Sequence, residues 1–347
     1  MESVDLAVRN LFQEFQEIVL KRTALERDLR VEGTVTRKKV KGKEYWYQQH
    51  TLKGQAVQDY IGPITAKSDK EITAIRKNQK ERKNQIRQLI FQERKKITIF
   101  RKAGFPVLDS LTSSLIEKLS QWNLVFNRGV LVGSHAFAAY SGMLGHFFDK
   151  ESLKTLDIDV VHDRSTRSED SPIEIVQPEG FIAIQGRNFY SVPELSHKTL
   201  PSSFVGPGGL RIDFLTPLRG RPGKRVSFPN LPFIGAQPLH FLDFLIKGPT
   251  VAVLMGPRGG IPVTVPDPAR YAIHKLIVAA RRPASENTKR LKDRAQASQL
   301  ITTCAEERPE ELQRVYKEAL GRGKGWKSAI SDSLHRLPPE ISRLLTG

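Results

Sequence analysis

The sequence has one cysteine, Cys304, in 347 residues, and only three methionines and three tryptophans. One thiol excludes a disulfide framework and every zinc site built from a cluster of cysteines. No apolar run reaches the roughly 18 residues that a membrane-spanning helix needs. The opening segment, Met1 to Asp5, is acidic and lacks the apolar stretch of a secretory signal. We therefore expect a cytoplasmic protein with no membrane partner.

Positive charge is abundant and unevenly distributed. The chain contains 55 Lys and Arg against 37 Asp and Glu, which gives a net charge of +18. Residues 1–105 contain 24 basic and 13 acidic side chains, so they carry +11 of this charge. Basic side chains that contact phosphates release condensed counterions, and this favours a polyanionic partner. A solvated basic surface is the alternative.

The first 105 residues predict one basic module. Apolar residues spaced three and four apart indicate a helix over residues 2–30. Residues 32–62 change to β-branched and aromatic residues, with turns near Lys41–Lys43 and Lys53–Gln55, and predict a small antiparallel hairpin. Residues 68–103 predict a long basic helix that Ser68 or Asp69 caps and that ends at Gly104.

Two features of this module indicate contact with nucleic acid. The long helix carries the basic residues Lys77, Lys80, Lys83 and Arg87. The hairpin interleaves lysines with aromatic residues around Trp46, on which a base could stack while the lysines meet phosphates. The alternative for the aromatic residues is that they pack the hairpin onto the long helix.

The remaining sequence predicts first a region of mixed helices and strands, and then a region of helices alone. Between residues 106 and 266 we expect a helix near the start, short strands with a helix among them, a basic loop and a final hairpin. These elements are residues 109–122, 129–132, 134–144, 156–161, 173–192 (two strands), 210–215, 219–225 (the loop), 251–255 and 261–265. From Pro268 to the end the pattern predicts helices.

Three aspartates on two of these strands indicate a metal site. Asp157 and Asp159 flank Ile158, and alternate side chains of a strand share a face. Asp213 stands in the same way between two apolar residues of a later strand. Three carboxylates on neighbouring strands are the ligands that two Mg²⁺ ions need for phosphoryl or nucleotidyl transfer. Read singly, each aspartate is an ordinary residue at the end of a strand.

Gly133 and Ser134 lie where an apolar strand meets a helix. Glycine allows close approach of the backbone, and the free N–H groups at a helix start favour a phosphate. A plain serine cap behind a tight turn is the alternative.

The order of these motifs resembles the nucleotidyltransferase superfamily, which has the DNA polymerase β-like fold. The resemblance covers roughly residues 125–216 and implies an α+β fold with a mixed-sheet catalytic core. It implies that Asp157, Asp159 and Asp213 bind Mg²⁺ or Mn²⁺ and are catalytic. It also implies that Gly133 and Ser134 hold the phosphates of a nucleoside triphosphate.

The helical end supports the same resemblance. Residues 265–276, with Arg281, Arg282, Lys292 and Asp293, look like the helical half of bacterial minimal nucleotidyltransferases, which include toxin types. Asp267 followed by Pro268 marks the start of a helix. The resemblance implies that Lys275 approaches the triphosphate. We expect Lys292 and Asp293 to pair with each other.

Together these patterns predict three units: a basic module (1–105), a catalytic core (106–266) and a C-terminal helical domain (267–347). We expect a Mg²⁺-dependent nucleotidyltransferase of the EC 2.7.7 type that transfers a nucleoside monophosphate from an NTP to an acceptor hydroxyl. The basic module makes RNA, including tRNA, the favoured acceptor. Two alternatives stay open: a toxin-like enzyme that modifies a protein, with a protein partner or antitoxin, and a non-catalytic nucleic-acid-binding protein on this scaffold.

Overall fold

A seven-stranded mixed sheet lies at the centre of the protein. The computed structural model describes residues 2–52, 55–121, 129–163, 189–193, 200–219, 226–228 and 231–346. The main strand order is β11 (Val226–Phe228), β12 (Leu231–Leu239), β10 (Arg211–Pro217), β7 (Asp157–His162) and β5 (Gly129–Val132). Strand β10 runs parallel to β7 and β12, whereas β5 is antiparallel to β7. Strands β9 (Ser203–Val205) and β8 (Tyr190–Ser191) extend the sheet beside the first half of β10.

Helices and a second sheet pack around this sheet. Helix α3 (Ser110–Gln121) precedes β5, and α4 (Gly133–Leu144) follows it directly. The chain then forms β6 (His146–Phe147), which pairs with β1 (Glu2–Ser3), and the short helix α5 (Lys150–Leu153). A 3₁₀ turn (Pro207–Gly209) and α7 (Leu242–Leu245) flank later strands, and β13 (Thr250–Met255) pairs with β14 (Gly260–Val265) as a hairpin. The predicted α+β fold is confirmed.

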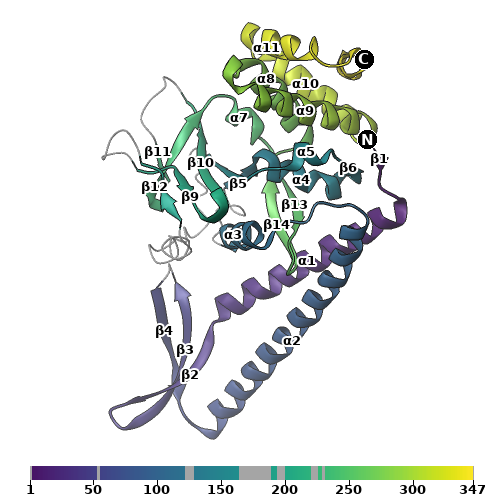
Figure 1. Ribbon diagram of the computed structural model, residues 1–347. Coiled ribbons are helices and arrows are strands. Elements are labelled where there is room, and N and C mark those ends of the chain that lie inside the picture. Colours follow the sequence, from purple (N-terminus) through teal and green to yellow (C-terminus); the bar gives the residue numbers. More distant parts are fainter. Residues whose placement is uncertain are drawn as a thin grey trace.

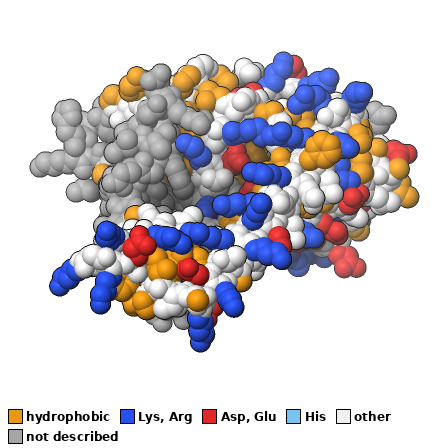
Figure 2. All heavy atoms as spheres, turned by 90° about the horizontal axis from the view of Figure 1, so that it is seen from below, with side chains coloured by type: hydrophobic (Ala, Val, Ile, Leu, Met, Phe, Trp, Pro, Cys, Tyr) orange, Lys and Arg blue, Asp and Glu red, His pale blue; other side chains and the backbone are white. Residues whose placement is uncertain are grey.

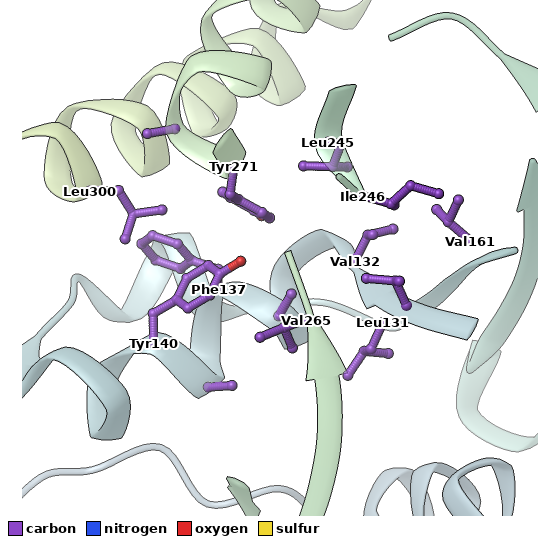
Figure 3. Packing of buried hydrophobic residues seen from close by; sticks show 14 of the residues in the cluster. Leu131, Val132, Phe137, Tyr140, Val161, Leu245, Ile246, Val265, Tyr271 and Leu300 are labelled. Atoms are coloured by element: carbon purple, nitrogen blue, oxygen red, sulfur yellow. The ribbon is translucent and has the colours of Figure 1, made fainter. Parts of the chain in front are cut away.

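The C-terminal helices share one core with the sheet. They are α8 (Pro268–Arg281), α9 (Asn287–Glu307), α10 (Pro309–Gly321), α11 (Lys324–Leu334) and α12 (Pro339–Thr346), with a 3₁₀ turn at Ala284–Glu286. As predicted, Asp267 caps α8, because its carboxylate accepts from the backbone of Ala269 and Arg270. Figure 3 shows Tyr271 of α8 close to Phe137 and Tyr140 of α4. One buried cluster therefore continues from the strands into the helices.

The N-terminal module projects from the opposite side. Helices α1 (Leu6–Glu32) and α2 (Ala66–Lys102) run side by side away from the central sheet, and a small sheet lies at their far end (Figure 1). A buried ion pair of the module contacts the hairpin β13–β14. Arg22 Nε lies 2.6 Å from Glu93 Oε1, and both side chains bond the backbone of Gly260.

The small antiparallel sheet has three strands, as the two predicted turns imply: β2 (Thr34–Val40), β3 (Lys43–Leu52) and β4 (Gln55–Pro63). The predicted helix cap is wrong. Thr65 caps α2, and its side chain and that of Ser68 bond each other's backbone N–H. Asp69 instead accepts the indole N–H of Trp46. The predicted turn at Lys53, most of the strands within 173–192 and the loop from 220 to 225 lie outside the described residues.

Candidate active site

The structure brings the three predicted aspartates to one face of the central sheet. Asp213 of β10 pairs in register with Asp159 of β7, and Arg211 pairs with Asp157. Register partners on neighbouring strands project to the same side. The residues between them, Ile158 and Ile212, point to the other face and are fully buried in the core. The alternation read from the sequence therefore places the acidic residues together.

Asp159 packs directly against Gly133. Strand pairing sets Val132 beside Asp159, so the carboxylate reaches the first residue of α4. Gly133 has φ 67°, and a Cβ atom at this position would overlap the Oδ2 atom of Asp159. Both observations require glycine here. The role of Gly133 in holding phosphate stays a prediction.

The aspartate face carries negative charge that is only partly neutralised. Burial, together with the nearby carboxylates of Asp213 and Asp157, raises the pKa of Asp159 to about 6. Lys275 and Arg211 act in the opposite direction without cancelling this effect. A bound divalent cation would remove the cost of ionising Asp159, so the oxygen-rich donor set fits Mg²⁺ or Mn²⁺. Within the described part of the chain, however, no three acidic, histidine or cysteine side chains already stand in a metal-holding group.

Arg211 contacts the third carboxylate, that of Asp213. Its Nε atom lies 2.9 Å from each carboxylate oxygen of Asp213, and its Nη2 atom donates to Ser203 Oγ at 3.0 Å. Ser203 also donates to Asp213. A protein cation therefore engages the third carboxylate. We did not single out Arg211 from the sequence, although the two-residue spacing from Asp213 places both on one face.

The C-terminal helices fix the Gly133–Ser134 junction. The hydroxyl of Tyr271 lies 2.9 Å from the carbonyl oxygen of Gly133 and 3.1 Å from Gln296 Oε1. Gln296 donates in turn to Ser134 Oγ at 3.3 Å and to the carbonyl of Ser152 at 2.7 Å. Ser134 is buried. No sequence motif indicated Gln296, because its role depends on how α9 docks on α4.

Lys275 lies close enough to the aspartate face to affect Asp159, and it is held by Asp293. Their ion pair measures 2.6 Å, and Arg282 Nε lies 2.6 Å from the other oxygen of Asp293. Burial opposes the charged form of Lys275, but Tyr271 and Asp293 outweigh it and raise the pKa of the lysine. The expected pairing of Lys292 with Asp293 is wrong, because Lys275 and Arg282 occupy that carboxylate and Lys292 donates to the carbonyl of Lys154.

Lys292 lies beside the same acidic face. Burial is the main cause that lowers the pKa of Lys292, and the charge of Lys275 adds to it, whereas Asp157 and Asp159 act in the opposite direction. Two lysines, Lys275 and Lys292, therefore approach the aspartates from the C-terminal helices. This combination can bind a polyanion together with the cations that accompany it.

The proposed stacking role of Trp46 is contradicted. Its side chain is 2% exposed and packs with Val35 and Ile72. The guanidinium groups of Arg37 and Arg76 each lie 4.9 Å from its ring. No base can reach the ring, so Trp46 packs the small sheet onto α2, as the alternative interpretation held.

Most basic residues of α2 are solvent-exposed, whereas Arg82 and Lys96 are half-buried and form ion pairs. Within the described part of the chain, the following four residues, here called the α2 stripe, form no ion pair: Lys77, Lys80, Lys83 and Arg87. Figure 2 shows Lys and Arg side chains spread over the face of the protein seen from below. The predicted contact of the α2 stripe with nucleic acid is compatible with this exposure and stays a prediction.

A family model described as nucleotidyltransferase matches residues 110–321, more than half of the chain, and the chain belongs to this family. The crystal structure of an antigenic nucleotidyltransferase-like protein from Paracoccidioides brasiliensis is similar at 17% identity and a TM-score of 0.40, over 68% of this chain and 91% of that one. No curated protein matches the chain. No helix within the described ranges has the length and apolar character to cross a bilayer.

Proposed function

We propose that the protein transfers a nucleoside monophosphate from an NTP to a hydroxyl group of RNA. The observation that carries the proposal is the register pairing of Asp213 with Asp159 on one sheet face, beside Gly133. Membership of the nucleotidyltransferase family supports the reaction class. The net charge of +18 and the exposed α2 stripe support RNA as the acceptor.

Asp157, Asp159 and Asp213 are the residues that would hold two divalent cations. Bound there, such cations neutralise the triphosphate and stabilise the charge that develops on the transferred phosphoryl group. Arg211 would compete with a cation for Asp213, since the guanidinium contacts both of its carboxylate oxygens.

The remaining residues bind and orient the triphosphate. Lys275 stays protonated because Asp293 pairs with it, and it is the candidate ligand for the phosphates. The first backbone N–H groups of α4, at Gly133 and Ser134, favour the β- and γ-phosphates. The acceptor oxygen attacks the α-phosphorus, the bond from this atom to the bridging oxygen breaks, and pyrophosphate leaves. The hydroxyl proton passes to a carboxylate, for which Asp213 is the candidate.

Labelling with NTPs that carry the radioactive phosphorus at the α- or at the γ-phosphate tests this function. The protein is incubated with each NTP labelled at the α-phosphate, Mg²⁺ or Mn²⁺, and total RNA or total protein. We expect RNase-sensitive label in the RNA fraction, no label from γ-labelled NTP, and no transfer by Asp159→Asn. Label in the protein fraction would replace RNA by a protein acceptor. No label in either fraction would overturn the enzymatic proposal and leave a non-catalytic nucleic-acid-binding protein.

A further inference from the structure

The two faces of the small sheet β2–β3–β4 differ sharply. Side chains alternate along β3, so Trp46 points to α2 while Tyr45 and Tyr47 point away from it. Tyr60 of β4 pairs with Tyr47 and shares its side of the sheet. Tyr60 is 57% exposed, and the other two tyrosines are half-buried. Trp46 and Val35 already pack the sheet onto α2, so this outward face is not needed for that contact.

The three tyrosines form a preassembled aromatic surface. The ring centroids of Tyr45 and Tyr60 lie 5.7 Å apart, as do those of Tyr47 and Tyr60. Lys38 of β2 lies over Tyr47, with its ammonium 5.4 Å from the ring centroid, and donates to Gln58 across the sheet at 3.0 Å. Rings held in this way lose little conformational entropy when a ligand stacks on them.

The acidic residues of this sheet lie on one face, whereas basic residues lie on both, since Arg37 and Lys39 share the side of Trp46. Strand alternation puts Lys38 and Lys43 on the side of the tyrosines. The acidic residues of the described strands, Glu44 and Asp59, fall on the other side, because Glu44 follows Lys43 and Asp59 precedes Tyr60. Aromatic rings beside lysines, on a face without carboxylates, suit unpaired bases and their phosphates. An acidic protein segment would meet the same lysines, but its Asp and Glu side chains could not stack on the rings as bases do.

A groove lies where the small sheet meets α1 and α2. It has a volume of about 270 Å³, and its lining includes Gln49, which shares the face of Tyr47, together with Arg30 and Lys83. Lys83 belongs to the α2 stripe. The groove therefore places basic side chains beside Gln49, two residues from Tyr47 on β3.

We propose that the tyrosine face, defined as Tyr45, Tyr47 and Tyr60 with Lys38 and Lys43, binds unpaired bases of single-stranded RNA. The proposal rests on the proposed function for its choice of RNA, and it adds a binding surface on the N-terminal module. Single strands are favoured over duplexes because only unpaired bases expose their rings for stacking.

Fluorescence anisotropy with a labelled single-stranded RNA and the matching duplex tests the tyrosine face, without NTP or metal. The double variant Tyr47→Ala with Tyr60→Ala is compared with Tyr60→Phe, which keeps the ring, and with Tyr190→Ala. Tyr190 is a matched control, since it is 68% exposed on β8 of the central sheet. We expect the double variant to lose about 10-fold or more in affinity for the single strand. Tyr60→Phe and Tyr190→Ala should stay near wild type.

Equal binding of the single strand by the wild type and the double variant would overturn the proposal, as would duplex binding that is as tight as single-strand binding. An equal loss in Tyr190→Ala would also overturn it, because the effect would not be local. Thermal melting of each variant shows whether the module is still folded, and Tyr60→Leu supplies a second ring-free variant if the double variant is not. The binding assay contains no NTP, so the two proposals can fail separately. RNA binding by the tyrosine face can be absent while label transfer is observed, and label transfer can be absent while this binding is observed.

Discussion

The central sheet and the N-terminal module both hold unneutralised charge, but of opposite sign and at different depth. Asp159 is half-buried against Gly133, and the cost of its charge appears as a pKa raised to about 6. The α2 stripe is exposed, so water and salt screen its repulsion. The first region gains most from a small cation held tightly at one place. The second suits a long polyanion that contacts many side chains weakly.

The largest effect should follow removal of the charge of Asp159. We expect Asp159→Asn to lower transfer by about 1,000-fold or more, which corresponds to about 4 kcal/mol of transition-state stabilisation. The same variant should be more stable than the wild type at pH 7–8 without metal. The raised pKa means that the folded state prefers the protonated acid, so stability is lost as the pH rises from about 4 through 6.

Thermal melts across this pH range, together with the labelling assay, check both halves of the prediction. The stability gain at pH 7–8 should approach but not exceed about 3 kcal/mol, from two pKa units. Mg²⁺ should raise the melting temperature of the wild type more than that of the variant. Asp332→Asn, at an exposed position on α11, is the control and should change neither property. A variant that melts lower at every pH would contradict this account of the site.

Reversing the α2 stripe should give the next largest effect. Changing all four of its residues to Glu should weaken RNA binding by about 100-fold at low salt and make the salt dependence shallower by about 3 in log–log slope. NTP binding should not change. A matched control places the same charge change on exposed residues of the C-terminal helices: Lys317, Lys324, Lys327 and Arg343. If both sets weaken binding equally, net charge matters and the α2 stripe does not.

Local patterns predicted most of this architecture, and long-range packing explains what they missed. The elements of the catalytic core and the face of Asp157 and Asp159 followed from alternation and turn residues, which act within a few positions. The burial of Trp46 depends on Arg76 and Ile72, which lie more than 25 positions away in sequence. Likewise, Lys292 is next to Asp293 in sequence, yet Asp293 forms its ion pair with Lys275. Adjacent helical residues point in different directions, so proximity in sequence was a poor guide.

A smaller loss is expected at Lys275. Lys275→Ala should weaken metal-dependent NTP binding by about 10-fold, because one charge contact to the phosphates is lost. It also leaves Asp293 buried with Arg282 as its remaining ion-pair partner, so some loss of stability should accompany it. Lys275→Arg keeps the charge and should bind better than Lys275→Ala, while Lys289→Ala, exposed on the neighbouring helix α9, should match wild type. NTP affinity that is unchanged in Lys275→Ala would show that Lys275 serves structure alone.

The smallest expected effect has the opposite sign and concerns Arg211. This side chain competes with metal for Asp213, so Arg211→Met should bind Mn²⁺ more tightly in the absence of NTP. The Arg211 side chain is 42% exposed, and an ion pair this accessible contributes at most about 1 kcal/mol. The gain should therefore stay below about fivefold in calorimetric titration. Arg219→Met is the control. It removes the ion pair between Arg219 and Asp163, which measures 3.0 Å, and should leave the Mn²⁺ affinity unchanged. Weaker Mn²⁺ binding in Arg211→Met would contradict this competition. It would mean that Arg211 is a positioning residue, which orients Asp213 for the metal.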